Sequence, residues 1–176
     1  MTTPSTPSQG FAPDSPAALH YPDFQHELAT TRRVLERYPD GKGDWKPDPK
    51  SRSISALASH IVDMLGLGAD VLETDSIEWT ERTPTPDLDS AKALTEGFDR
   101  NAARLTNALR SSSDDTLAQS WVLNFQGHPG VTGVRRNLLR SFLMSHIVHH
   151  RAQLAGYYRM LDIPVPPIYG PSADER

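Results

Sequence analysis

The stretch LRSFLMSHIVHHRAQLAGYYRML, residues 139–161, carries the clearest helical pattern in the chain. Its apolar and histidine positions recur at steps of three and four, which is the repeat of one helix face. These positions are Leu139, Leu143, His146, His150, Leu154, Tyr157 and Leu161. Pro164 and Pro166 follow and cannot continue a helix. The pattern therefore predicts a long helix over residues 139–161 with two histidines on its inner face.

Three earlier segments have the same repeat and predict three more helices. Their apolar stripes cover residues 24–38, 57–71 and 91–109. Ser51 or Ser53 is expected to cap the second of these helices, and Asp87 or Asp89 the third, because short polar side chains accept from free N–H groups at a helix start.

Residues 119–134 depart from the helical repeat. Trp121, Leu123 and Phe125 alternate, and glycines follow at 127 and 130, so a short hairpin or an irregular crossover fits best. We therefore predict an all-α fold, a four-helix bundle with a long crossover between its third and fourth helices and a hairpin as one form of that crossover.

The length of 176 residues suits one domain. Residues 1–16 are rich in proline, serine and threonine and hold almost nothing apolar, so we expect a disordered N-terminal tail. Residues 17–176 are expected to form a single domain.

The composition excludes several functional classes. The chain has no cysteine, which rules out disulfides, thiolate metal sites and cysteine nucleophiles. Its net charge of −4 argues against a nucleic acid partner. No apolar run reaches the roughly 20 residues of a membrane helix, and the N-terminus lacks a secretory signal. We expect no membrane contact and a cytoplasmic location.

The histidines carry the chemical information. His146 and His150 lie one helical turn apart, where their Cβ atoms are about 5–6 Å apart and face the same side. That spacing lets two ring nitrogens reach one metal ion at about 2.0–2.1 Å. His60 lies at the inner edge of the second predicted helix, and a three-histidine site would leave positions open for water or substrate. Core histidines bonded to serine, tyrosine or backbone are an equally weighted alternative.

His149 and Asp63 are the candidates for groups that support these ligands. His149 is rotated off the pair, and a supporting or structural role is favoured over ligation. Asp63 follows His60 by one turn and is placed to orient it, although an exposed helix carboxylate is the simpler interpretation. No catalytic residue is identified.

The remaining marked residues have structural interpretations. We expect an ion pair that anchors the last helix through Arg151, and packing roles for Trp45, Trp79 and Trp121. The histidines outside the predicted site are also read as structural, namely His20, His26 and His128.

Nearly the whole chain after the tail resembles the DinB-like superfamily, named for damage-inducible bacterial proteins. Three stretches carry the resemblance: DWKPDPKSRSISALASHI at 44–61, SHIVHHRAQLAGYYRMLDIPVP at 145–166 and IYGPSADE at 168–175. Relatives often have a histidine in the first stretch where this chain has Asp48, a change expected to affect the mouth of the pocket rather than the metal site.

The resemblance implies a four-helix bundle with a divalent metal held by His60, His146 and His150. It also implies frequent homodimers, and relatives that transfer or isomerise with a low-molecular-weight thiol such as bacillithiol or mycothiol. Histidine ligation suits zinc or nickel first, with iron, copper and manganese as further alternatives.

Three functions remain open at this stage. A metal-dependent thiol transferase acting on a small molecule would lower the pKa of the bound thiol. A metal-dependent hydrolase would activate water, with Asp63 or His149 as proton shuttle. A non-enzymatic, stress-linked protein would hold a structural, four-ligand metal.

Overall fold

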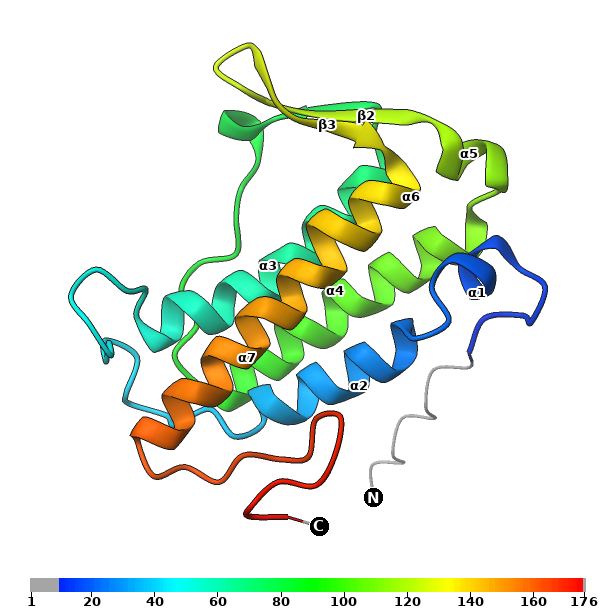
Figure 1. The fold of residues 1–176 in the computed structure, drawn as a ribbon. Helices are drawn as coiled ribbons and strands as arrows, with labels where there is room; N and C mark the ends of the chain where they lie inside the picture. Colours follow the sequence, from blue (N-terminus) through cyan, green and yellow to red (C-terminus); the bar gives the residue numbers. More distant parts are fainter. Residues whose placement is uncertain (1–9, 176) are drawn as a thin grey trace, which may run out of the picture.

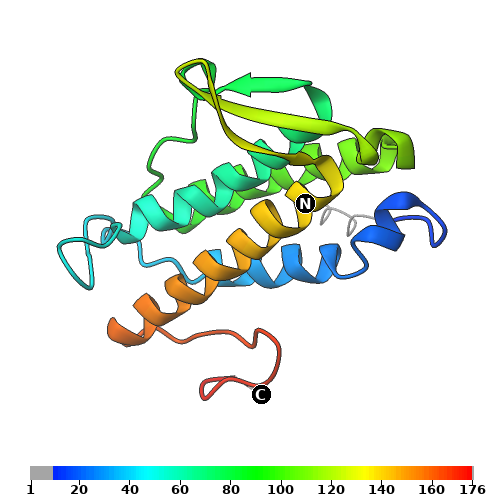
Figure 2. The same ribbon diagram turned by 45° about the horizontal axis from the view of Figure 1, so that its top comes forward.

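A computed structural model describes residues 10–175, and long helices dominate it (Figure 1). These helices run through the body of the molecule, and a small sheet lies across one end, as the turned view also shows (Figure 2). The elements are α1 Pro16–His20, α2 Phe24–Leu35, α3 Ile54–Glu73, β1 Ser76–Glu78, the 3-10 turn η1 Trp79–Glu81, α4 Ala91–Ser111, α5 Asp114–Ala118, β2 Ser120–Phe125, β3 His128–Val134, α6 Arg135–Asn137, the π-helical η2 Leu138–Met144 and α7 Ser145–Met160.

The central helix is α3, which packs against α4, α7 and η2. Most of its side chains are buried, including Leu57, Ile61 and Leu65, each at most 1% exposed. By length and composition α3 is apolar enough to cross a membrane, contrary to the expectation that no segment reaches that limit. Within the protein, 83% of its most apolar window is buried, so its apolar character is explained by packing on all sides.

The helix starts follow the short polar side chains nearest to them. Ser53 caps α3, because its Oγ accepts from the N–H of Ala56 at 3.2 Å, as predicted. The predicted cap of the next helix was wrong, since Ser90 and not Asp87 or Asp89 accepts from Ala93 at the start of α4. Asp89 instead accepts from the hydroxyl of Tyr38 at 2.7 Å.

The prediction of an all-α four-helix bundle was wrong, because the described residues contain a three-stranded mixed sheet. The hairpin of β2 and β3 is the one that the alternation over 119–134 indicated. Its two-residue turn places Gln126 and Gly127 at positive φ, as hairpin turns of this length require. The third strand, β1, pairs in parallel with β2, and the sequence analysis missed it.

The turn of the hairpin is also held by β1. Both carboxylate oxygens of Glu78 accept from the turn, at 2.9 Å from the N–H of Gln126 and 2.9 Å from that of Gly127. Strand β1 has only three residues, too few to display the alternation by which a strand is recognised, and its partner lies beyond α4 in the sequence.

The predicted last helix is one rod of three parts, α6, η2 and α7. In η2 the ladder widens, and the N–H of Ser145 bonds to the carbonyl of Arg140, five residues back. Buried pairs in this rod accordingly step by five, from Leu138–Leu139 to Leu143–Met144. The rod therefore keeps one face on the core although the sequence departs there from the ordinary helical repeat.

The N-terminal segment is described from residue 10 onward. Residues 1–9 of the predicted tail lie outside the described residues. Residues 10–16 lead into α1, and Phe11 stacks on Phe24 with ring centroids 5.5 Å apart.

Candidate metal centre

The structure brings His60 of α3 together with His146 and His150 of α7. One ring nitrogen of each lies within 4.8 Å of the other two. The ring centroids are 5.2 Å apart for His60 and His146, 4.8 Å for His60 and His150, and 4.5 Å for His146 and His150. His150 is 8% exposed, and the other two rings are half-buried.

This donor set fits a divalent metal. Two nitrogens bound to one ion at about 2.0–2.1 Å lie at most about 4.2 Å apart, so closure by about 1 Å brings the three rings into one coordination sphere. Three neutral donors on two rigid helices leave further positions to other ligands, the arrangement of catalytic rather than structural sites. Because two of the rings are half-buried, the cluster is open to solvent.

The surroundings favour the neutral imidazole that binds metals. Burial lowers the pKa of His60 to about 4, and the charge of Arg52 and the two other rings act in the same direction. Burial is also the main cause that lowers the pKa of His146 and of His150, and Arg52 adds to both shifts.

A glutamine that the sequence analysis did not single out contacts this centre. The Nδ1 atom of His150 lies 2.7 Å from Oε1 of Gln153, one turn further along α7. The signal was the spacing, because positions i and i+3 on a helix face the same side.

His149 lies beside the cluster and outside it. Its ring centroid is 5.0 Å from that of His150, its side chain is exposed, and it does not join the group of three converging nitrogens. Asp48 is exposed and accepts from the N–H of Lys50 in its own loop.

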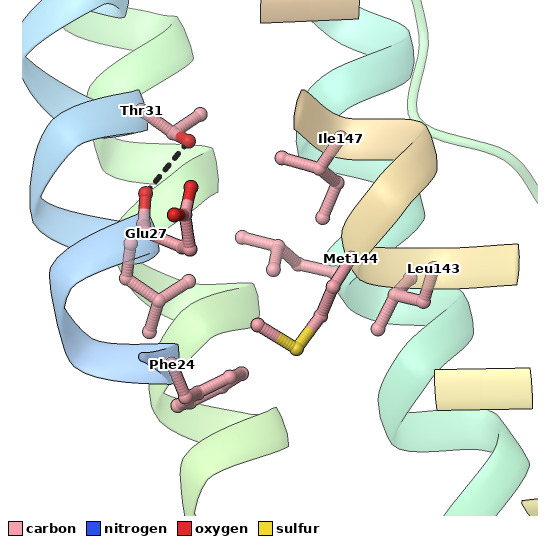
Figure 3. A pocket seen from close by; sticks show the side chains of 8 residues that line it. Phe24, Glu27, Thr31, Leu143, Met144 and Ile147 are labelled. Atoms are coloured by element: carbon pink, nitrogen blue, oxygen red, sulfur yellow. Dashed lines mark hydrogen bonds between the residues drawn. The ribbon is translucent and has the colours of Figure 1, made fainter. Parts of the chain in front are cut away.

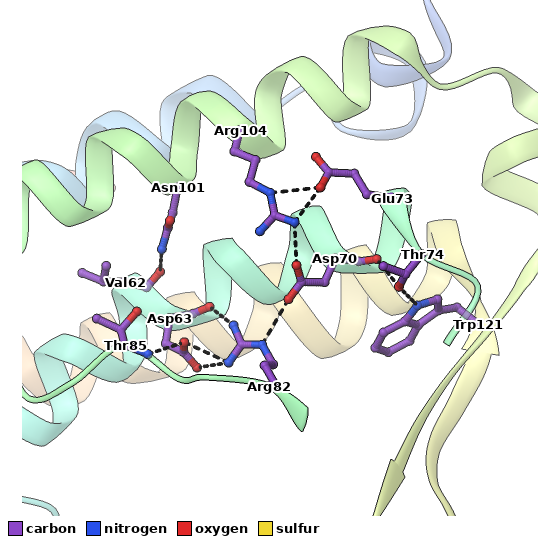
Figure 4. A network of polar contacts seen from close by, with 10 residues as sticks. All are labelled: Val62, Asp63, Asp70, Glu73, Thr74, Arg82, Thr85, Asn101, Arg104 and Trp121. Atoms are coloured by element: carbon purple, nitrogen blue, oxygen red, sulfur yellow. Dashed lines mark hydrogen bonds and ion pairs between the residues drawn. The ribbon is translucent and has the colours of Figure 1, made fainter. Parts of the chain in front are cut away.

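Asp63 is not the exposed carboxylate that the simpler interpretation expected. It is 5% exposed, and Arg82 donates to both of its oxygens at 2.9 and 2.8 Å (Figure 4). The N–H of Thr85 donates to it as well, at 2.9 Å. These contacts join the loop before α4 to α3. The carboxylate of Asp63 is therefore bonded to that loop.

The predicted anchoring role of Arg151 is confirmed. Its buried guanidinium donates to Glu27 at 2.7 Å and to the hydroxyl of Thr31 at 3.1 Å, both on α2, and to the hydroxyl of Tyr169 at 2.7 Å. The residue next to His150 therefore fixes α7 against α2 and the C-terminal segment.

The other marked residues have their own partners. His20 pairs with Asp114, and His26 stacks on Tyr169. Trp121 is fully buried and donates to Thr74 at 3.1 Å. The two remaining tryptophans lie against aromatic rings, Trp45 on Tyr157 and Trp79 on Phe125, and His128 stands in β3 opposite Phe125.

A small, mostly apolar pocket lies between α2 and the rod of η2 and α7 (Figure 3). Its lining includes Phe24, Glu27, Met144 and Ile147 and none of the three histidines. It is therefore separate from the candidate metal centre.

Comparisons with known proteins agree with this architecture. The sequence model of the DinB family matches residues 14–176. The chain is similar to the protein YrdA of Bacillus subtilis strain 168, with 25% identity over 156 residues, 86% of this chain and 87% of that one. Crystal structures of two DinB-like proteins have the same fold: YjoA from Bacillus subtilis at TM-score 0.64, 20% identity and coverage of 90% of this chain and 99% of that one, and a protein from Bacillus cereus ATCC 10987 at TM-score 0.65, 21% identity and coverage of 85% and 95%.

Proposed function

This chain belongs to the DinB family, and from that premise we propose that it binds one divalent metal ion through His60, His146 and His150 and uses it in a reaction on a small molecule. The observation that carries the proposal is the convergence of three ring nitrogens, each within 4.8 Å of the other two, from two separate helices. Zinc and nickel suit this donor set best, and iron, copper and manganese are the further alternatives.

The protein residues around the site hold the metal ion, and the ion acidifies the molecule that binds to it. A divalent ion in such a site lowers the pKa of a thiol or of water. The helices α3 and α7 hold the imidazoles, Gln153 holds His150, and Arg52 adds a positive charge near all three rings. The positive surroundings favour an anionic reactant at the centre.

The reaction class we propose is transfer of a low-molecular-weight thiol to a small electrophile. The chain has no cysteine, so a sulfur nucleophile must come from the co-substrate. The half-buried rings leave the cluster open to such a molecule. Hydrolysis is the competing reaction, and of its two candidate proton shuttles Asp63 is paired with Arg82, which leaves His149.

Metal content tests the binding proposal. Untagged wild-type protein is expected to hold about one ion per chain by elemental analysis, and His150→Ala is expected to lose it. His149→Ala is the matched control, because it removes the neighbouring exposed imidazole and is expected to keep the ion. Absence of metal from the wild type after incubation with zinc and with nickel would refute the proposal.

Reaction class is tested on the metal-loaded protein. Turnover of small electrophiles is followed with and without an added low-molecular-weight thiol, with His146→Ala as the inactive reference. Thiol-dependent turnover supports a transferase, and equal turnover without thiol identifies a hydrolase. A metal that is retained with no exchangeable position would favour the structural role. The expected homodimer is part of this proposal and is checked by sedimentation of the same samples.

A further inference from the structure

The amide of Gln153 makes a short polar contact to the cluster. Its Oε1 lies 2.7 Å from Nδ1 of His150, which is hydrogen-bond distance. An amide oxygen accepts and cannot donate, so this contact is a hydrogen bond in the form of His150 that carries its proton on Nδ1. A neutral imidazole has one protonated and one unprotonated nitrogen, which leaves the lone pair of His150 on Nε2.

Three other imidazole rings lie close to His150. His60, His146 and His149 have centroids 4.8, 4.5 and 5.0 Å from it. Ring contacts of this kind do not select between the two protonation patterns of a neutral imidazole, whereas the hydrogen bond to Gln153 does. The orientation of His150 is therefore set by one residue of its own helix.

We propose that Gln153 is a positioning residue that fixes His150 with Nε2 directed to the metal, an inference that rests on the proposed metal site. Partners of this kind set ring orientation and raise ligand basicity, and their loss typically weakens metal binding by about 10–100-fold. A carboxylate at this position would also accept from Nδ1, so glutamate can take the place of the amide in this role.

The side chain of Gln153 is exposed, so substitutions at this position are expected to leave the fold intact. Gln153→Ala removes the acceptor, and Gln153→Glu restores one of similar reach. Gln119→Ala is the matched control, an exposed glutamine at the end of α5. Zinc affinity is measured by competition with a chelator. Metal-free protein is examined in parallel by nitrogen-15 NMR of the histidine rings and by thermal unfolding.

The expected result has three parts. Gln153→Ala binds zinc about 10–100-fold more weakly than wild type, Gln153→Glu recovers the affinity at neutral pH, and Gln119→Ala is unchanged. Metal-free wild type has the His150 proton on Nδ1, and Gln153→Ala has a mixture of the two forms. All variants unfold at the wild-type temperature.

Two results would overturn the inference and leave the metal site standing: zinc affinity of Gln153→Ala within twofold of wild type, or a wild-type His150 proton on Nε2. A weakened Gln153→Ala that unfolds earlier and is not rescued by Gln153→Glu would assign a merely structural role. No zinc binding by the wild type would refute the proposed function itself, and the inference with it.

Discussion

His60 illustrates how a single buried group links metal-free stability to pH. Its folded pKa of about 4 is depressed from the ordinary value of 6.5, because burial and nearby positive groups disfavour the charged ring. Between pH values of about 4 and 6.5, the ring of His60 is protonated in the unfolded chain and neutral in the folded protein. The free energy of unfolding of metal-free protein should therefore fall as the pH is lowered from about 6.5 towards 4.

Urea denaturation of metal-free protein at pH 7, 6, 5 and 4.5 measures this slope. His60→Asn should lose stability less steeply over the same range, because one of the groups that differ between the two states is gone. Parallel curves for the two proteins would show that the depressed pKa of His60 is not responsible.

Two glycines offer a second comparison at single positions. Gly68 lies in α3 where a Cβ would collide with the side chain of Leu143 and lie 3.1 Å from Leu105. Gly156 lies in α7 with nothing within 4 Å of a Cβ. Gly156→Ala should stabilise the protein by about 0.5–1 kcal/mol through lower chain entropy. Gly68→Ala should instead destabilise it, since overpacking costs about 1–3 kcal/mol.

Chemical denaturation of both alanine variants is the measurement. Because Gly156→Ala gives the helix-propensity effect alone, the difference between the variants isolates the steric cost at Gly68. Equal stabilisation of both would mean that Leu143 moves aside freely.

The loop from η1 to the start of α4 is joined to α3 by a set of ion pairs. Arg82 bonds to Asp63 and, at 3.1 Å, to Asp70, and Arg104 of α4 donates to Asp70 at 2.6 Å (Figure 4). The side chain of Arg82 is 9% exposed, whereas that of Arg104 is 43% exposed. The two arginines share a partner and differ in burial.

Arg82→Met should therefore destabilise the protein by about 3–5 kcal/mol, because it leaves the buried carboxylate of Asp63 without its ion pair, whereas Asp70 keeps Arg104. Arg104→Met should cost at most about 1 kcal/mol, as exposed ion pairs do. Urea midpoints of the two variants decide this, and similar losses would contradict the role of burial.

The helical elements and the histidine cluster followed from local patterns. The spacing of His146 and His150 on one helix, with His60 at the inner edge of another, made a shared three-histidine site one of two equally weighted interpretations, and the resemblance to the DinB-like superfamily favoured it. Ser53 was also one of the two caps predicted for α3. Gln153 was missed because its role depends on which way the ring of His150 turns, and Asp63 because its partner Arg82 comes from a distant loop.

Strand β1 of the sheet and the π-helical segment η2 could not be predicted from local sequence patterns. Strand β1 is defined by pairing with β2, which no local alternation records. Segment η2 was expected as ordinary helix because steps of three, four and five overlap over seven residues. In both cases long-range contacts, and not intrinsic preference, select the backbone.

At the scale of the whole molecule, the C-terminal segment after α7 closes over α2. Arg33 donates to the carbonyl of Pro167 at 3.1 Å, Arg37 pairs with Glu175, and Arg159 pairs with Asp174. The hydroxyl of Tyr169 joins this segment to the buried pair of Glu27 and Arg151. The chain end is thereby attached to the helix that presents His146 and His150.

Tyr169→Phe removes only that hydroxyl. We expect a loss of about 1 kcal/mol, which lowers the thermal midpoint by about 2–4 °C. Zinc affinity should stay at the wild-type value, since the substituted group lies on the far side of Arg151. Scanning calorimetry and zinc titration test both statements, and an unchanged midpoint would mean that the other ion pairs suffice to hold the segment.

The parallel pairing of β1 with β2 has a consequence for the order of assembly. The two strands are separated by all of α4 and α5, so the chain must close a long loop before their first hydrogen bond forms. Strand β1 also lies partly in solvent, unlike α3. Native-state hydrogen exchange should find the amides of α3 slowest and those of β1 among the fastest of the regular elements. The strand that comes first in the sheet would then be the last to join it and the first to leave.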